Sequence, residues 1–225
     1  CLQKLYETGT IRVPLPIASD KDFIVMEVFI SADQKNDWAE ILGRQLAQLH
    51  ECSQRNEFGF ERDNYIGTTK QINTWSDSWP DFWREQRLGF QIHLFSNKTD
   101  KDDRLLIMAE LLMQKLDDYL LDIDEAAILL HGDLWSGNAA ADESGAPIIF
   151  DPASYYGHRE AEIGMMRMFG GFGPRCEAAY AEVWPLAAGA EERIKLYRLY
   201  HELNHLNLFS ASYYQQCLST MESLL

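Results

Sequence analysis

The stretch that decides the fold is His131-Gly132-Asp133-Leu134-Trp135-Ser136-Gly137-Asn138, and Phe150-Asp151-Pro152 brings an aspartate thirteen residues after its end. Its spacing matches the catalytic-loop pattern H-x-D-L-x-x-x-N. A phosphoryl-transfer site needs one carboxylate that accepts the proton of the acceptor hydroxyl, and hard oxygen ligands that hold Mg²⁺ on the triphosphate. Asp133 has the position of the proton-accepting carboxylate, and Asn138 and Asp151 supply the oxygen ligands for Mg²⁺.

The flanking residues predict the backbone that this pattern requires. The apolar run 127–130 predicts a short strand that leads into the loop. Residues 139–141 and 147–150 predict two further strands joined by a turn at 142–145, and this hairpin would return Asp151 to the loop. A His-Gly-Asp tripeptide alone also fits an ordinary strand-to-loop turn. The asparagine, the hairpin and the second aspartate together favour the catalytic interpretation.

The composition excludes several classes of protein. A chain of 225 residues with 46% apolar residues can bury a core and suits one domain, or a domain plus part of another. Its formal charge of −15 argues against nucleic acid and against an anionic membrane as the main partner. No apolar run approaches the roughly 20 residues that span a bilayer. The 4 cysteines are scattered without a Cys-x-x-Cys pair, so we expect a reducing, cytoplasmic location.

The rest of the chain predicts a little sheet followed by many helices. Residues 23–29 predict a buried strand, residues 38–50 have apolar positions at helical spacing, and residues 56–74 predict a long polar loop. Four further helices are expected, at 102–121, 160–169, 175–187 and 191–217. We therefore predict an α+β fold of the kind found in kinases, mainly its larger helical lobe with the catalytic hairpin inside.

Five segments carry a resemblance to a known family: LGRQLAQLH (42–50), FGF and DNYIG (58–67), LHGDLWSGN (130–138), DPASYYGHREAE (151–162) and LNHLNLF (203–209). They resemble the fructosamine kinases, also called ketosamine-3-kinases, which are related to aminoglycoside and choline kinases. The resemblance implies a protein-kinase-like fold. In that fold, residues 1–29 would be a remnant of the N-terminal β lobe with the hinge, and residues 30–225 would be the helical C-terminal lobe.

The resemblance also implies a reaction and its catalytic groups. Asp133 would be the catalytic base, and Asn138 and Asp151 would be the Mg²⁺ ligands. The substrate would be a sugar adduct on an amine, free or linked to a protein, whose 3-hydroxyl is phosphorylated with ATP. Phosphorylation makes the adduct unstable, so the reaction would reverse glycation.

Two more sets of residues receive roles from the resemblance. Met26, Glu27 and Val28 would form the hinge whose backbone binds the adenine of ATP. Trp135 would stack on the sugar or aminomethyl part of the substrate, although a packed hydrophobic side chain is an equal alternative. From its position after Asp151, and not from the resemblance, His158 is expected either to touch the substrate or to lock the loop by ion pairing.

Several alternatives remain open from the sequence. The Gly-rich loop, the strand lysine and the helix glutamate of kinases would all precede Cys1 in this alignment, so we expect the chain alone to be incomplete for catalysis. It could instead be a kinase for an aminoglycoside-like or choline-like metabolite, or a kinase-shaped binding module without catalysis. Residues His201 to His205 also match the zinc-protease pattern H-E-x-x-H, but their amphipathic helix favours packing.

Overall fold

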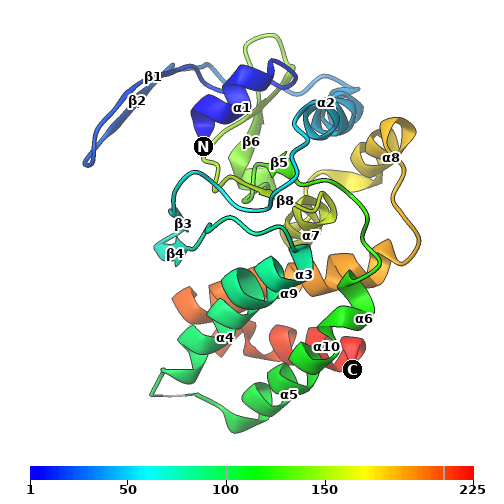
Figure 1. The fold of residues 1–225 in the computed structure, drawn as a ribbon. Coiled ribbons are helices and arrows are strands. Elements are labelled where there is room, and N and C mark those ends of the chain that lie inside the picture. Colours follow the sequence, from blue (N-terminus) through cyan, green and yellow to red (C-terminus); the bar gives the residue numbers. More distant parts are fainter. Residues whose placement is uncertain (100, 210) are drawn as a thin grey trace.

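The computed structural model describes residues 1–99, 101–209 and 211–225. Helices dominate it (Figure 1). The α-helices are α1 (Leu2–Thr8), α2 (Trp38–Cys52), α3 (Trp79–Trp83), α4 (Gly89–Ser96), α5 (Asp103–Gln114), α6 (Leu116–Leu120), α7 (Glu160–Phe169), α8 (Gly173–Val183), α9 (Ala190–Phe209) and α10 (Tyr214–Leu224). A π-helix, η1 (Arg84–Leu88), joins α3 to α4, and two 3₁₀ turns are η2 (Ser136–Asn138) and η3 (Ala211–Tyr213).

In the described residues, the strands form four separate two-stranded antiparallel sheets. The pairs are β1 (Pro16–Ser19) with β2 (Ile24–Met26), β3 (Asn64–Ile66) with β4 (Thr69–Gln71), β5 (Ile128–Leu130) with β8 (Tyr155–Gly157), and β6 (Ala139–Ala141) with β7 (Pro147–Ile149). β5 leads into the catalytic loop, while β6 and β7 are the hairpin that follows it. In β6–β7 the register pairs Ala139 with Ile149 and Ala141 with Pro147, so the hairpin closes as the sequence predicts.

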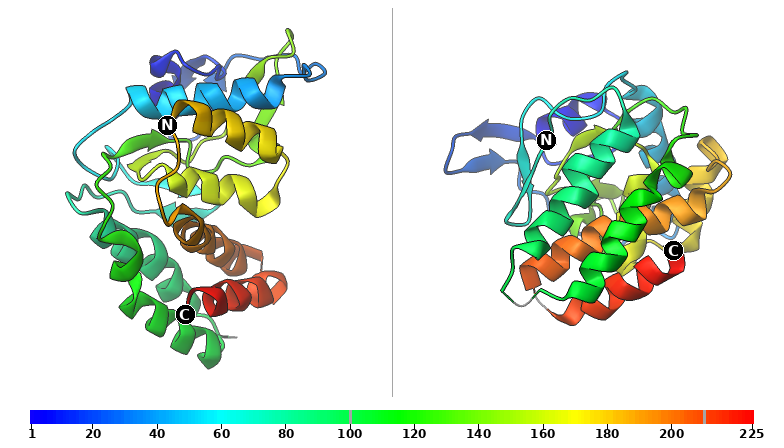
Figure 2. Two further views of the ribbon diagram at one scale, coloured as in Figure 1. Left: turned by 90° about the vertical axis from the view of Figure 1, so that its right-hand side faces the viewer. Right: turned by 60° about the horizontal axis from the view of Figure 1, so that its bottom comes forward.

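The helices lie in two groups on either side of the strands that carry the catalytic loop. Helices α1, α2 and α8 lie at one end of the molecule, and α3 to α6, α9 and α10 make up the other end (Figures 1 and 2). Helix α2 packs along α8 within the first group. Helix α7 lies between the two groups and packs along α9 of the second group. No helix in the described part of the chain is long and apolar enough to cross a membrane.

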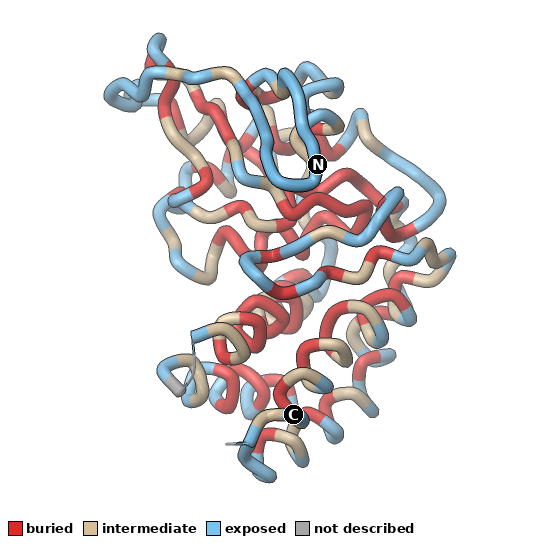
Figure 3. The backbone as a smooth tube through the Cα atoms, turned by 90° about the vertical axis from the view of Figure 1, so that its left-hand side faces the viewer, coloured by how far each residue is buried: buried red, intermediate tan, exposed pale blue. Residues whose placement is uncertain are grey.

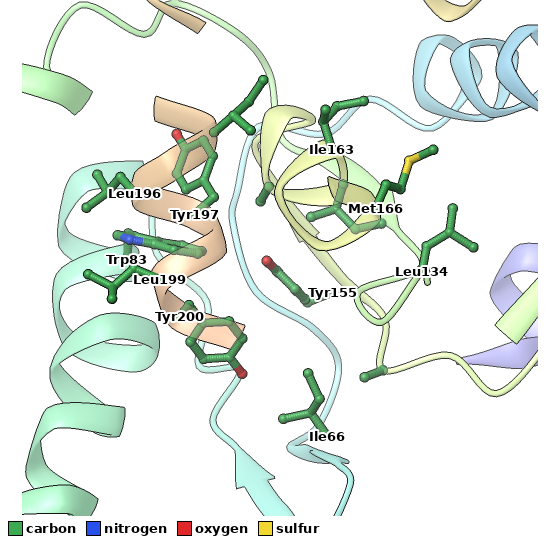
Figure 4. Packing of buried hydrophobic residues seen from close by; sticks show 14 of the residues in the cluster. Ile66, Trp83, Leu134, Tyr155, Ile163, Met166, Leu196, Tyr197, Leu199 and Tyr200 are labelled. Atoms are coloured by element: carbon green, nitrogen blue, oxygen red, sulfur yellow. The ribbon is translucent and has the colours of Figure 1, made fainter. Parts of the chain in front are cut away.

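One continuous apolar core supports this arrangement. All three residues of β5, of β7 and of β8 are buried, and the buried backbone runs through the centre of the molecule (Figure 3). Tyr155 of β8 lies between Met166 of α7 and Tyr200 of α9 (Figure 4). Burying side chains of this size contributes about 1.5–3 kcal/mol each relative to exposure. The strand after the catalytic hairpin is therefore fixed against both α7 and α9.

Four sequence predictions need correction. The run 23–29 is not a buried strand: β2 covers only Ile24–Met26, and all three of its side chains are exposed to solvent. The loop 56–74 contains the β3–β4 hairpin. The helix expected at 102–121 breaks at Lys115 into α5 and α6, and the one expected at 191–217 ends at Phe209 before α10 begins. The predicted helices at 38–50 and 160–169 are confirmed.

Candidate active site

The three oxygen-bearing side chains of the predicted site lie together. Asn138 donates from Nδ2 to Oδ2 of Asp133 at 3.2 Å, to the carbonyl of Asp133 at 2.9 Å and to the carbonyl of Asp151 at 3.4 Å. The hairpin produces this arrangement, because the amide of Phe150 donates to the carbonyl of Asn138 at 3.0 Å and so places Asp151 beside it. All three residues line one cavity of about 650 Å³.

Asp133 has the electrostatics of a proton acceptor. Burial raises the pKa of its carboxyl from 3.8 to about 7, and the negative charge of Asp151 adds to that rise, whereas the hydrogen bond from Asn138 opposes it. A general base works best when its pKa is near the operating pH. Asp151 is exposed, so its carboxylate faces solvent, whereas the carboxylate of Asp133 is partly desolvated.

His131 holds the loop from the side of β5. Its Nε2 lies 2.9 Å from the carbonyl of Phe150, so this nitrogen carries the proton, and its Nδ1 accepts the backbone N–H of Asp133 at 3.3 Å. Burial lowers the pKa of His131 to about 4, which keeps the ring neutral in this tautomer. The imidazole thus connects the two ends of the catalytic hairpin.

Glu162 of α7 holds the same loop through its backbone amides. Its carboxylate accepts the backbone N–H groups of His131 at 2.5 Å and of Gly132 at 3.1 Å. The side chain is fully buried, and that burial raises its pKa to about 7 although the backbone hydrogen bonds lower it. Glu162 thus supplies the hydrogen-bond acceptor for two buried backbone amides that have no acceptor within the loop.

Two backbone conformations shape the loop. Gly132 has φ +82°, and a Cβ there would meet the carbonyl oxygen of Ala153 at 2.2 Å, so only glycine fits. Asp151 has φ +57° and is the one non-glycine residue with positive φ in the described part of the chain. Such conformations cost free energy and are found at functional sites. Here the left-handed residue is also the second aspartate of the predicted metal site.

The match to a family model covers the whole chain: the fructosamine kinase model aligns with residues 1–225. The chain belongs to the fructosamine kinase family. Among curated relatives, the chloroplastic protein-ribulosamine 3-kinase of Arabidopsis thaliana is 42% identical over 100% of this chain and 70% of its own length. The ketosamine-3-kinase of Mus musculus is 35% identical over 99% of this chain and 81% of its own length.

Solved structures confirm the protein-kinase-like fold of this fructosamine kinase family member. A crystal structure described as that of a fructosamine-3-kinase from Thermobifida fusca has a TM-score of 0.91 at 31% identity, covering 99% of this chain and 78% of the other. An aminoglycoside phosphotransferase in complex with ADP and hygromycin B has a TM-score of 0.67 at 15% identity, covering 99% and 82%. The second likeness concerns the fold alone.

The two predicted substrate contacts separate in the structure. Trp135 lines the cavity with Asp133, and its ring lies 5.5 Å from that of Phe169. His158 does not line this cavity: it is buried, its Nδ1 lies 3.0 Å from the hydroxyl of Tyr197 and its Nε2 lies 3.2 Å from Glu125. A substrate contact in this cavity is therefore not supported for His158, whereas its contacts with Glu125 and Tyr197 fit the other role expected for it, which is to hold its own segment in place.

The predicted hinge lies at the end of the exposed β1–β2 hairpin. Met26 ends β2, and Val28 is 91% exposed. Glu27 accepts from the amide of Leu15 at 3.0 Å and from Arg12 at 2.8 Å. Arg12 also pairs with two carboxylates in the turn of the catalytic hairpin, Asp142 at 2.7 Å and Glu143 at 2.9 Å. One guanidinium thus joins the hinge segment to the hairpin that carries Asp151.

The H-E-x-x-H segment lies in α9, where Glu202 and His205 have other partners. Nδ1 of His205 lies 2.8 Å from the carbonyl of His201, and Glu202 pairs with Arg198 at 2.8 Å. Burial lowers the pKa of His201 to about 3. Within the described residues, no three histidine, cysteine, aspartate or glutamate side chains are grouped so that they could hold a metal ion. For the buried His201 and Glu202, a packing role fits better than the zinc alternative.

Sequence reasoning missed part of the cavity wall. Asn204, His205, Leu208 and Phe209 of α9, with Tyr213 after it, line the same cavity as Asp133. Their spacing of three or four residues places them on one face of the helix. That spacing was visible in the sequence, but only the fold shows that this face meets the catalytic loop.

Proposed function

We propose that the chain is the catalytic part of an ATP- and Mg²⁺-dependent kinase that phosphorylates the 3-hydroxyl of ketosamines, and that it acts in the repair of glycated amines. The observation that carries this proposal is the shared cavity of Asp133, Asn138 and Asp151, with a pKa of about 7 at Asp133. The names of the relatives, which are ribulosamine, ketoamine and ketosamine kinases, support the choice of substrate class.

In the proposed reaction, Asp133 orients the acceptor hydroxyl and takes its proton. The bond between the substrate oxygen and the γ-phosphorus forms, the bond to the β,γ-bridging oxygen breaks, and ADP leaves with the electron pair. Such a transfer depends mainly on positioning and on charge stabilisation. The hydrogen bond from Asn138 fixes the direction of the Asp133 carboxylate, so the base is oriented before the substrate binds.

The donor set fits a hard divalent cation. Asn138 uses its Nδ2 for hydrogen bonds to the loop, which leaves its amide oxygen on the other side of the group. Asp151 adds an exposed carboxylate from the neighbouring strand end. Mg²⁺ prefers one or two such oxygen ligands together with substrate phosphates. We therefore assign Asn138 and Asp151 as its ligands, and the ion would neutralise charge on the transferred phosphoryl group.

The nucleotide base would bind at the hinge, residues Met26 to Val28. This assignment is supported by the aromatic contact next to it, in which the ring of Phe29 lies 5.5 Å from that of Phe150, the residue before Asp151. The hinge is thereby tied to the end of the hairpin that would hold the metal. We also propose a cytoplasmic location, because the 4 cysteines are free thiols.

A substrate panel tests the proposal. The full-length polypeptide that contains this chain would be incubated with labelled ATP and, separately, with a lysine-linked fructosamine, a ribulosamine, an aminoglycoside and choline. We expect phosphate transfer to the ketosamines alone, followed by slow release of the amine. Transfer to an aminoglycoside or to choline alone would identify a different metabolite kinase. ATP binding without transfer to any acceptor would identify a kinase-shaped binding module.

A further inference from the structure

The β3–β4 hairpin (Figure 1) contacts the segment that follows Asp151. Asn64 of β3 donates from Nδ2 to the carbonyl of Ser154 at 2.8 Å. Gln71, which pairs with Asn64 in the register of the hairpin, donates from Nε2 to the carbonyl of Ala153 at 2.9 Å. Two side-chain amides thus hold two consecutive backbone carbonyls just after the proposed metal ligand.

The same amides are connected to a third one. Oδ1 of Asn64 accepts from Nε2 of Gln71 at 2.8 Å and from Nδ2 of Asn73 at 2.9 Å. Oδ1 of Asn73 in turn accepts from Nη2 of Arg87 at 2.7 Å. We call this chain of hydrogen bonds, from Arg87 through Asn73 and Asn64 to the carbonyl of Ser154, the amide relay.

Arg87 is the starting point of the amide relay. It is fully buried in η1, where its guanidinium carbon lies 4.5 Å from the ring centroid of Phe82 and 4.0 Å from that of Tyr155. Its Nη1 donates to the carbonyl of Ile72 at 2.6 Å. A charge is costly to bury, and π-helical turns are frequent at functional sites. The presence of this arginine therefore indicates a role beyond filling the core.

The direction of the amide relay is fixed at both ends. An arginine can only donate hydrogen bonds, and a carbonyl oxygen can only accept them. The amide oxygen of Asn73 must therefore face Arg87, which turns its NH₂ group toward Asn64. The oxygen of Asn64 then faces Asn73, and its own NH₂ group faces the carbonyl of Ser154. One orientation of each amide satisfies all of these partners.

The backbone at Asp151 needs such support. Its φ of +57° costs free energy, and such a conformation persists only where the surrounding structure holds it. Pro152 follows and has no N–H through which it could be held. The carbonyl of Ala153 is also the surface on which the catalytic loop packs, because a Cβ on Gly132 would meet it at 2.2 Å. The amide relay therefore holds the backbone at the point where both halves of the site meet.

We propose that Asn73 and Asn64 are positioning residues for the divalent cation: the amide relay keeps Asp151 in the backbone conformation that presents its carboxylate to the ion. Within the described chain, the relay residues lie outside the lining of the catalytic cavity, so they act through the backbone and touch neither substrate nor nucleotide. This inference rests on the proposed function, because it takes Asp151 as a ligand of the cation.

Asn73→Asp in the full-length polypeptide tests the amide relay. The variant keeps the size of the side chain and the oxygen that faces Arg87, but it has no NH₂ group. The NH₂ group of Asn64 would turn toward the new carboxylate and leave the carbonyl of Ser154. Binding of Mn²⁺ in the presence of ADP, followed by electron paramagnetic resonance, should show a Kd that is about 10–100-fold higher, the range for groups that orient metal ligands. An added negative charge alone would attract the cation and lower the Kd, so the two effects have opposite signs.

A second variant and a matched control complete the test. Asn64→Ala removes the donor to Ser154 without adding a charge and should raise the Kd for Mn²⁺ over the same range. Lys70→Met is the control, because Lys70 lies on the exposed face of β4, opposite Gln71, and pairs with Asp63 at 2.9 Å. It should bind Mn²⁺ as the wild-type protein does. Thermal unfolding checks that all three variants fold.

The kinetics of the same variants distinguish positioning from a general structural role. The Mg²⁺ concentration that gives half the maximal rate should rise in Asn73→Asp and Asn64→Ala by the same factor as the Kd for Mn²⁺. The KM for the fructosamine should stay unchanged, because the substrate does not touch the amide relay.

A wild-type Kd for Mn²⁺ in either variant of the amide relay would overturn the inference, and so would an equal loss in Lys70→Met. The same measurements separate it from the proposed function. If the wild-type protein phosphorylates the fructosamine and the relay variants bind Mn²⁺ normally, only the relay is wrong. If the wild-type protein does not bind Mn²⁺ in the presence of ADP, the metal assignment is wrong and the relay with it.

Discussion

Replacing the catalytic base should make the protein more stable. In Asp133→Asn the side chain keeps its shape and can still accept the hydrogen bond from Asn138, but it no longer has a charge in a buried site beside Asp151. Active sites commonly hold such unfavourable groups because catalysis requires them. We therefore expect Asp133→Asn to lose activity and to gain free energy of unfolding.

The magnitude follows from the pKa of Asp133, which is 3.8 as an ordinary value and about 7 in the folded protein. Because the folded pKa is the higher one, the penalty is absent below about pH 4, grows as pH rises toward 7 and is constant above it. At 1.36 kcal/mol per pKa unit, the gain in Asp133→Asn is about 4 kcal/mol at pH 8 and about 2 kcal/mol at pH 5.5.

Urea unfolding of both proteins at the two pH values measures this gain. Asp142→Asn is a matched control, because Arg12 at 2.7 Å lowers the pKa of Asp142 and its charge is stabilising. That control should lose stability at both pH values. The reasoning is refuted if Asp133→Asn is no more stable than wild type at pH 8, or if its gain is the same at pH 8 and pH 5.5.

Three further changes test the same site. Asp151→Asn should lower the pKa of Asp133, because the charge of Asp151 helps to raise it; a carbon-13 NMR titration of the carboxyl groups measures this, and an unchanged midpoint would contradict it. Gly132→Ala should abolish activity and lower the free energy of unfolding, because its Cβ would clash with the carbonyl of Ala153. Gly9→Ala is the control: it also has positive φ, but no atom lies within 4 Å of the new Cβ, so its free energy of unfolding should fall by only about 1–2 kcal/mol. Arg12→Met removes three ion pairs, so amide hydrogen exchange should become faster in the β1–β2 hairpin and stay slow in α2. If the hairpin amides of the variant exchange as slowly as those of the wild-type protein, Arg12 does not hold the hinge segment to the catalytic hairpin.

Local chemistry explains why the catalytic hairpin could be predicted. The distance between Asn138 and Asp151 is set by two short strands and the five residues 142–146 that join them, in which Asp142 accepts the amides of Ser144 and Ala146. These interactions are all close in sequence, so the residue pattern contains them. Helix α2 was predictable for the same reason, from apolar positions at helical spacing.

Burial and long-range contacts could not be predicted in this way. The run 23–29 has the composition of a core strand, but burial depends on what packs against a strand, and residues Ile24–Met26 are exposed. His158 lies seven residues from Asp151 and still faces Tyr197 instead of the cavity, because α9 packs there. His205 is distant in sequence from Asp133, and only the packing of α9 against α7 brings it into the same cavity.

The most direct test of the central claim is the rate of phosphate transfer from ATP to a lysine-linked fructosamine by full-length Asp133→Asn. The account predicts a fall of about 10²–10⁴-fold in kcat, with the affinity for ATP unchanged, because the variant loses the proton acceptor and keeps the remaining site. A variant that transfers phosphate at nearly the wild-type rate would contradict the assignment of Asp133 and, with it, the proposed mechanism.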